Sequence, residues 1–329
     1  MKIAILAKTA QRTNVFDDTY FDRMRKHGEL SIFNQDDFND RAYLLDVCRG
    51  ANVIITTWGT PKLEKDILEV CPDLQCVIHA AGTPKPVITP ELIDKKVRLT
   101  ASNIAIGEGV AETALALMIG ACKKFFWLCQ DTANGMWAEN KPKVKDFYDI
   151  KVGIVSGGMV GRHMVKLLKN FHVDILMYDP TLTKEEIAEI GAEKVGLDEM
   201  MSVCDVVSIH APSIPATDNM INQENLKWMK DGAVLVNTAR GSIIHEADLI
   251  EELKKGRIYA CLDVTLPEPP AKDNPLRTLP NVVLTPHIAG TVTNGLKRIA
   301  LHACEELDRF CAGERMKTEV NFDELSQMA

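Results

Sequence analysis

Short runs of β-branched and aliphatic residues recur along the first hundred positions, and polar or turn-forming residues bound each run. Such runs are typical of strands that are buried on both faces, as in a parallel sheet. The longer segments between them carry apolar residues at spacings of three and four, which predicts amphipathic helices. The predicted strands are residues 2–7, 53–56 and 75–79, and the predicted helices are residues 17–27, 39–48 and 62–70.

A second set of strands and helices follows a long apolar helix. Alanine and leucine dominate residues 110–124, which predicts that helix. A final helix is predicted over residues 294–311, with Gly313 as its C-cap, followed by a short strand that ends at Val320. The strand-like runs of this set are residues 152–155, 173–178, 233–236, 258–262 and 282–284. The two alternating sets predict an α/β protein with two doubly wound parallel sheets.

Composition narrows the class of protein. The 329 residues suffice for two domains, and a hydrophobic content of 46% suffices for packed cores. A net charge of −8 argues against a nucleic-acid-binding protein, whose surface would be basic. Nine cysteines without metal-like spacing predict reduced thiols in a cytoplasmic protein, and no metal is implied. No signal peptide and no apolar stretch of the ~20 residues that span a membrane is evident, so we expect no membrane association.

Three chemically active side chains each follow one of the later strand-like runs. They are Arg240 in VNTARG, Glu268 in DVTLPEP and His287 in LTPHIAG. Because the carboxyl ends of parallel strands meet at one edge of a sheet, we expect all three to face one cleft. A guanidinium can hold a carboxylate and polarise a carbonyl, while an imidazole exchanges protons near neutral pH and a carboxylate can orient it. Each residue alone could be an ordinary surface or buried residue, but together they predict a site for a small anionic substrate and a proton transfer.

A turn between a strand and a helix predicts a dinucleotide site. Residues 151–168 read KVGIVSGGMVGRHMVKLL. A GxGxxG turn lets backbone amides and a helix N-terminus bind a pyrophosphate. Gly158 and Gly161 fit this pattern, but Ser156 replaces the first glycine, so an ordinary strand-to-helix turn remains an alternative. The loop residues expected to contact the cofactor are Ser156, Gly157, Gly158, Met159 and Val160.

An aspartate follows the next strand-like run. Asp179 lies about twenty residues beyond the turn, where a carboxylate accepts hydrogen bonds from the adenosine ribose hydroxyls. The same carboxylate repels a 2′-phosphate, so NAD is favoured over NADP. The alternative is that Asp179 only forms a turn ahead of Pro180.

With these features, the chain resembles the D-isomer-specific 2-hydroxyacid dehydrogenase family over most of its length. The resemblance implies that Arg240 binds the substrate, Glu268 supports the histidine and His287 is the acid/base. Blocks similar to those of the family occur in the family's order: VAE at 110–112, GIVSGGMVG at 153–161, DVVSIHAP at 205–212, KDGAVLVNTARG at 230–241, LDVTLPEP at 262–269 and TPHIAG at 285–290.

The resemblance implies further contacts. Asp263 matches the aspartate that holds the nicotinamide carboxamide; His210 and Pro212 match residues that line the cofactor crevice, although His210 could equally be a strand-end histidine without chemistry. The other expected cofactor contacts are Thr238, Ala239, Arg240, His287 and Gly290. The expected substrate contacts, besides Arg240, lie in HAAGTPKPVI and are Ala81, Gly82 and Thr83. This loop lacks the aspartate that usually follows the family's glycine. Of all the properties that the resemblance implies, the identity of the substrate is therefore the one that it predicts least well.

The resemblance also implies an architecture and an activity. A Rossmann NAD-binding domain over residues 102–291 would be inserted in a flavodoxin-like substrate domain made of residues 1–101 and 292–329. The protein would be an NAD-dependent oxidoreductase that interconverts a D-2-hydroxy acid and its 2-oxo acid, as a homodimer. A phosphite-type dehydrogenase and an NAD-sensing, corepressor-like binding protein remain alternatives. Trp58 either faces the cleft and limits substrate size or is a core aromatic, which we favour.

Overall fold

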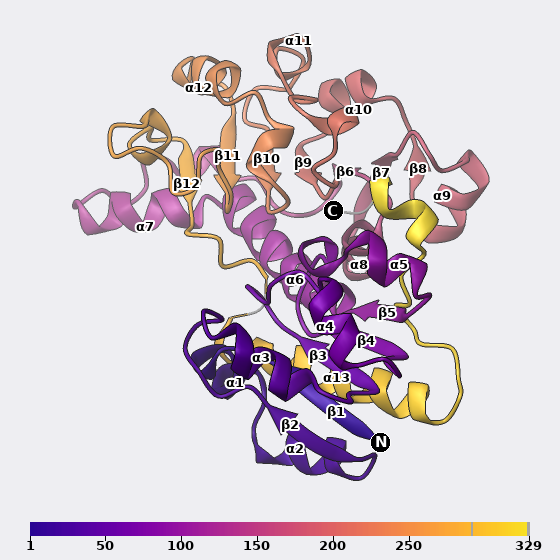
Figure 1. Cartoon of the computed structure of the whole chain (residues 1–329). Helices are drawn as coiled ribbons and strands as arrows, with labels where there is room; N and C mark the ends of the chain where they lie inside the picture. Colours follow the sequence, from indigo (N-terminus) through magenta and orange to yellow (C-terminus); the bar gives the residue numbers. More distant parts are fainter. Residues whose placement is uncertain (291, 328–329) are drawn as a thin grey trace. The chain divides into compact units, whose positions relative to one another are not determined.

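The protein is described by a computed structural model over residues 1–290 and 292–327, and these residues form two compact units. The first unit contains Met1–Ile106 together with residues 292–327, and the second contains Gly107–Gly290. Each unit is built on one parallel sheet with helices on both faces (Figure 1). The predicted α/β class with two parallel sheets is confirmed.

The sheet of the first unit has the strand order β2-β1-β3-β4-β5, which is the flavodoxin-like order. Its strands are β1 (Lys2–Leu6), β2 (Glu29–Ile32), β3 (Val53–Thr56), β4 (Cys76–His79) and β5 (Arg98–Ala101). The three strands predicted in this part of the chain are present. The pattern missed β2 and β5, which are the edge strands. Edge strands tolerate polar residues, so ELSI and RLTA lack the continuous apolar runs of the central strands.

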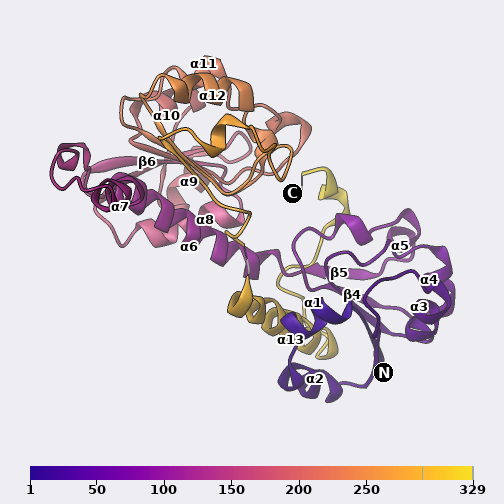
Figure 2. The same ribbon diagram turned by 90° about the vertical axis from the view of Figure 1, so that its left-hand side faces the viewer.

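Alternate residues of the central strands supply two cores in this unit. Ile3 and Ile5 of β1 pack with α1, α2 and α13, whereas Ala4 and Leu6 pack with α3, α4 and α5. Figure 2 shows these two groups of helices on opposite faces of the sheet. The helices are α1 (Thr9–Val15), α2 (Asp18–Arg25), α3 (Arg41–Cys48), α4 (Lys65–Val70), α5 (Pro90–Asp94) and α13 (Leu296–Cys311).

The sheet of the second unit has the order β12-β11-β10-β9-β6-β7-β8, and all its strand pairs are parallel. The chain winds outward from β6 in one direction and from β9 in the other, as in dinucleotide-binding folds. The switch point therefore lies at the carboxyl ends of β6 and β9. The strands are β6 (Ile150–Val155), β7 (Val173–Tyr178), β8 (Glu193–Lys194), β9 (Val206–Ile209), β10 (Val234–Asn237), β11 (Tyr259–Leu262) and β12 (Val282–Leu284).

Helices cover both faces of this sheet as well. One core is shared with α6, α8 and α9 and the other with α10, α11 and α12 (Figure 2). The helices are α6 (Asn103–Cys122), α7 (Phe125–Ala133), α8 (Met159–Leu168), α9 (Lys184–Ile190), α10 (Leu197–Val203), α11 (Gln223–Leu226) and α12 (Glu246–Lys254). Short 3₁₀ turns lie at Lys85–Val87, Lys141–Lys143, Pro215–Thr217, Gly241–Ile243, Pro275–Arg277, Thr293–Gly295 and Phe322–Gln327.

Helix α6 begins at Asn103, earlier than the predicted residue 110. Gly107 and Gly109 weaken the intrinsic helix propensity of its first turns. The helix packs closely at Gly109, because a Cβ there would lie 3.1 Å from the Gly290 carbonyl oxygen. Tertiary contact thus extends the helix beyond the segment that the pattern predicts.

The length and apolar composition of α6 would allow it to cross a membrane, which we did not expect, and no other helix of the described residues has both properties. Its small and apolar side chains pack in the core of the second unit, among them Ala111, Ala114, Met118 and Ala121. Core packing therefore accounts for this composition.

The C-terminal segment differs from the prediction. Gly313 follows α13 with a φ of +71°, the left-handed conformation expected after a helix. The short strand predicted to end at Val320 is wrong, because no strand forms in the described residues that follow α13. Instead, a single antiparallel bridge joins Glu319 to Thr100, and the Val320 N–H donates to the Leu99 carbonyl over 2.7 Å.

Candidate active site

His287 and Glu268 form a hydrogen-bonded pair in the second unit. Glu268 lies in the loop after β11, and His287 follows β12. Their Nδ1 and Oε1 atoms are 2.7 Å apart, and the side chains are 47% and 39% exposed. A carboxylate on Nδ1 orients the ring and stabilises the imidazolium, and it leaves Nε2 as the nitrogen that can exchange a proton with a ligand.

Asp263 anchors the loop that carries His287. Its carboxylate is almost fully buried and accepts the N–H of Ile288 over 2.9 Å, that of Ala289 over 2.7 Å, and the hydroxyl of Thr285. Its carbonyl accepts the N–H of His287 over 3.0 Å. His287 has a φ of +53°, which is uncommon for a residue with a side chain. The surrounding hydrogen bonds therefore hold the histidine in a strained conformation, a role that the motif alone did not reveal.

Arg240 lies in a tight turn after β10. Its Nη1 atom donates to the Ala239 carbonyl over 2.6 Å, and the Asn237 side chain closes the turn through the Arg240 carbonyl over 2.9 Å. A Cβ at Gly241 would lie 2.2 Å from the Thr265 carbonyl carbon, so only glycine allows this turn to pack against the loop that leads to Glu268. The described residues show no hydrogen bond or ion pair between the guanidinium and a carboxylate, which leaves it available to an anion.

The predicted dinucleotide loop has the geometry of its motif in spite of the serine. Ser156 has a φ of +83°, a conformation that glycine adopts without strain. A Cβ at Gly161 would lie 2.0 Å from the Ser156 carbonyl oxygen, so strand and helix approach as closely as the motif requires. Among the side chains that the structure describes, none caps the N-terminus of α8 at Gly158. Its first-turn N–H groups can therefore bind a pyrophosphate.

Asp179 bridges this loop and its own turn. One oxygen accepts the Gly157 N–H over 2.8 Å, and the other accepts the N–H and hydroxyl of Thr181 over 2.8 and 2.7 Å. Burial by itself raises the pKa of Asp179, but the hydrogen bonds from Thr181 and Gly157 outweigh it, so the pKa lies below its ordinary value. The turn foreseen as an alternative does form, and it keeps the carboxylate ionised beside the loop.

Two buried polar atoms without partners lie at the switch-point edge. His210 and Thr238 follow the neighbouring strands β9 and β10. Within the part of the chain that the structure describes, His210 Nδ1 and Thr238 Oγ1 have no hydrogen-bond partner. Burial lowers the pKa of His210 to about 4, so the ring is neutral. Because unpaired buried polar groups are costly, polar groups of a bound dinucleotide fit here.

In the first unit, the predicted substrate loop follows β4. The Ala81 carbonyl accepts the Ser102 N–H over 3.1 Å, whereas the N–H groups of Gly82 and Thr83 have no acceptor among residues 1–290 and 292–327. Two adjacent free N–H groups can bind a carboxylate. Trp58, in the loop after β3, is 37% exposed, so the interpretation as a core aromatic is wrong.

His79 supports this loop. This role was not predicted from the sequence. The side chain is 3% exposed, and its Nδ1 atom lies 2.8 Å from Thr56 Oγ1 on β3. Burial lowers the pKa of His79 to about 4, and a hydrogen bond to the Thr83 backbone opposes this shift only in part. The neutral ring therefore joins β3, β4 and the loop. The sequence feature that could have indicated this role is the position of His79 directly after the apolar residues of β4.

Comparisons with known proteins show which family the chain resembles. Residues 115–289 match the family described as D-isomer specific 2-hydroxyacid dehydrogenase, NAD binding domain. The chain is 31% identical over 286 residues to a D-3-phosphoglycerate dehydrogenase of Methanocaldococcus jannaschii, covering 86% of this chain and 54% of that protein. It is 30% identical over 267 residues to a hydroxypyruvate reductase of Thermotoga maritima, covering 80% of this chain and 86% of that protein.

A solved structure shares the fold. The NAD-complexed D-isomer specific 2-hydroxyacid dehydrogenase of Lactobacillus delbrueckii ssp. bulgaricus aligns with a TM-score of 0.78 and 22% identity, covering 98% of this chain and 100% of that one. The chain spans about half the length of the phosphoglycerate dehydrogenases it matches, with 54% and 40% of each covered. Since the family match extends over more than half of the sequence, this chain belongs to the D-isomer-specific 2-hydroxyacid dehydrogenase family.

Proposed function

We propose that the protein is an NAD-dependent oxidoreductase that interconverts a D-2-hydroxy acid and its 2-oxo acid. The observation that carries this proposal is the 2.7 Å hydrogen bond between His287 and Glu268. This acid/base pair is in the same unit as a strand switch point with an uncapped helix N-terminus and two unpaired buried polar atoms. Family membership makes hydride transfer the expected reaction.

The side chains have distinct roles in this proposal. A dinucleotide held at the switch point would supply or accept the hydride. In the reductive direction, His287 Nε2 gives a proton to the substrate oxygen, and Glu268 stabilises the imidazolium before the transfer. Arg240 binds the substrate carboxylate and polarises the carbonyl. In the first unit, the free N–H groups of Gly82 and Thr83 are the proposed substrate contacts, with Ala81 beside them.

The dinucleotide is proposed to be NAD. The hydrogen bonds that keep Asp179 ionised place a negative charge beside the loop, and this charge disfavours a 2′-phosphate. The proposed contacts of this cofactor are Ser156, Gly157, Gly158, Met159, Val160, Asp179, His210, Pro212, Thr238, Ala239, Arg240, Asp263, His287 and Gly290.

We further propose a homodimer that forms through the second unit. Helix α7 and the segment after it expose large aromatic side chains, with Phe125 55%, Trp137 74% and Tyr148 64% exposed. Exposed aromatic residues of this size are enriched in protein interfaces. Analytical ultracentrifugation of the wild type and of Trp137→Ser tests this: a dimer that dissociates in the variant supports it, and a wild-type monomer contradicts it.

Steady-state assays test the proposed reaction. NADH and NADPH are offered with a panel of 2-oxo acids that includes hydroxypyruvate and glyoxylate, and phosphite with NAD is assayed in parallel. We expect saturable NADH oxidation with at least one 2-oxo acid and its loss in His287→Asn. Turnover of phosphite alone would favour the phosphite-type alternative. NADH binding without turnover of any substrate would favour the corepressor-like binding protein.

A further inference from the structure

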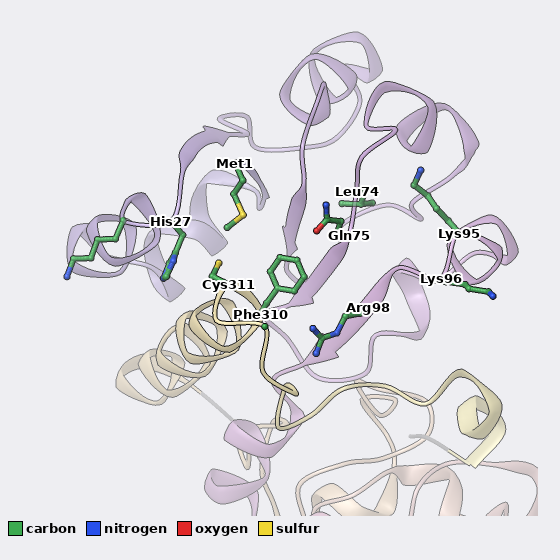
Figure 3. Close-up of a pocket in the computed structure, with 11 residues that line it drawn as sticks. Met1, His27, Leu74, Gln75, Lys95, Lys96, Arg98, Phe310 and Cys311 are labelled. Atoms are coloured by element: carbon green, nitrogen blue, oxygen red, sulfur yellow. The ribbon is translucent and has the colours of Figure 1, made fainter.

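A groove of about 850 Å³ lies entirely within the first unit (Figure 3). Met1, Gln75 and Arg98 line it at the amino ends of β1, β4 and β5. His27 and Phe310 line it at the carboxyl ends of α2 and α13. The loop with Gly82 follows the carboxyl end of β4. The groove therefore lies at the opposite edge of the sheet from the proposed substrate contacts of this unit.

The charges in this groove are of one sign. Four of its eleven lining residues are Lys or Arg, a fifth is His27, and none is Asp or Glu, although the whole chain has 46 Asp or Glu and 38 Lys or Arg. The nearby Asp308 is already paired with His27, with Nε2 and Oδ1 2.6 Å apart. Glu319 is paired with Arg98 over 2.8 Å. Because these two acids are already paired with His27 and Arg98, they do not neutralise the positive charges of the lysines in the groove.

Three lysines supply that positive charge. Lys26 and Lys96 make no side-chain hydrogen bond or ion pair within the described residues, and Lys95 donates only to the Pro72 carbonyl over 2.6 Å. Figure 3 shows Lys95 and Lys96 at one rim and His27 at the other. Lys96 has a φ of +54°, at a position after α5 where glycine is the less strained residue.

Arg98, which lines the groove beside Phe310, is held in place. Its Nε and Nη2 atoms donate to the Glu319 carboxylate over 2.8 and 2.9 Å, and the guanidinium stacks on the Phe310 ring at 5.7 Å. The Nη1 atom has no hydrogen-bond partner among the residues described. Because the guanidinium is already held in place, a ligand that binds the two free N–H groups of Nη1 pays little entropy for ordering this side chain. Phe310 and Leu74 add an apolar wall.

We propose that this cationic groove, defined by Lys26, Lys95, Lys96, Arg98 and Phe310, binds a small organic anion with at least two negative charges. The three lysines and the free Nη1 donor hold the charged groups, and the apolar wall packs against the carbon skeleton. Phosphate esters and polycarboxylates share this chemistry. The proposal is independent of the dehydrogenase reaction, because none of these residues belongs to the candidate active site.

Isothermal titration of the full chain with inorganic pyrophosphate and, separately, with citrate tests the proposal. The test variant is Lys26→Gln/Lys95→Gln/Lys96→Gln. The control is Lys65→Gln/Lys227→Gln/Lys254→Gln, whose lysines are exposed and pair with acids on their own helices. Both variants remove three positive charges, so each changes the net charge from −8 to −11. Thermal unfolding confirms that each variant is folded.

We expect saturable binding of at least one probe to the wild type and the control. Exposed ion pairs are each worth roughly a threefold change in affinity, so the test variant should bind ~30-fold more weakly. Binding should also weaken as salt rises. Tighter binding of pyrophosphate would indicate that the natural ligand is a phosphate ester, and tighter binding of citrate would indicate a polycarboxylate. Equal affinity of the test variant and the control for the probe that binds, as expected if the probe binds elsewhere, for example at the N-terminus of α8, would overturn the proposal. No saturable binding of either probe to the wild type would overturn it as well.

Discussion

Acidification should destabilise the protein through His79, whose side chain is buried at the carboxyl end of β4. Burial lowers its pKa from 6.5 to about 4. Between these two pH values the unfolded chain binds a proton that the folded protein does not, so stability falls as the pH decreases from 6.5 toward 4. Each pH unit in this window corresponds to about 1.4 kcal/mol, so at pH 5 the contribution of His79 lies about 2 kcal/mol below its value at pH 7.

The measurement compares free energies of unfolding in urea at pH 7 and pH 5 for the wild type and for His79→Gln. Other groups, such as Asp179 and Glu306, also titrate differently in the folded state, but they do so equally in both proteins. The loss of stability between the two pH values should therefore be about 2 kcal/mol smaller in the variant.

His172→Gln is the matched control, because the side chain of His172 is exposed and forms no ion pair within the described residues. It should reproduce the wild-type dependence on pH. An equal loss of stability in the wild type and His79→Gln would refute the assignment of His79 as a neutral buried ring.

Four substitutions test the candidate site. His287→Asn should lower turnover by roughly 10²-fold or more while NADH affinity, followed by titration, changes little; near-wild-type turnover would remove His287 from the mechanism. Asp263→Asn replaces one acceptor oxygen by an amide nitrogen, so at least one buried N–H group loses its acceptor at a cost of ~1–3 kcal/mol. We expect kcat to fall at least ~10-fold, and an unchanged kcat would show that the loop is held by other contacts. Asp179→Ala should narrow or reverse the NADH over NADPH ratio in kcat/KM, and a constant ratio would contradict the charge argument. Ser156→Gly should retain or improve NADH binding and raise Tm, whereas a lower Tm would mean that the positive φ carries little strain.

The sequence by itself determined the central strands of both sheets. Val53–Thr56 and Val173–Tyr178 were predicted with the observed bounds. Val53–Thr56 is buried at every position, and burial on both faces requires a run of apolar residues that can be recognised locally. Val173–Tyr178 was recognised from its mostly apolar run, although only Leu176 and Met177 are buried. The strands β2, β5 and β8 were not predicted. Each is at or near a sheet edge, where polar residues are tolerated and the local pattern is lost.

The sequence also indicated the residues of the candidate site, because short motifs with a characteristic spacing and order along the chain can be recognised without a structure. Arg240, Glu268 and His287 each follow a strand, as their positions after apolar runs predicted. The contact between Glu268 and His287 was expected from chemistry, and the structure supplies its distance. The departure at Ser156 was visible in the sequence, but its conformational consequence was not.

Only the tertiary structure decided how these residues are supported. The Asp263 carboxylate binds backbone groups 25 and 26 residues away, and His79 meets Thr56 across 23 residues. The cationic groove gathers residues from the amino ends of three strands and the carboxyl ends of two helices. The sequence pattern predicts which side chains are buried, because buried positions recur at every turn of a helix and at every second residue of a strand. Hydrogen bonds and ion pairs between distant segments produce no periodic pattern in the sequence, so these contacts become evident only in the folded structure.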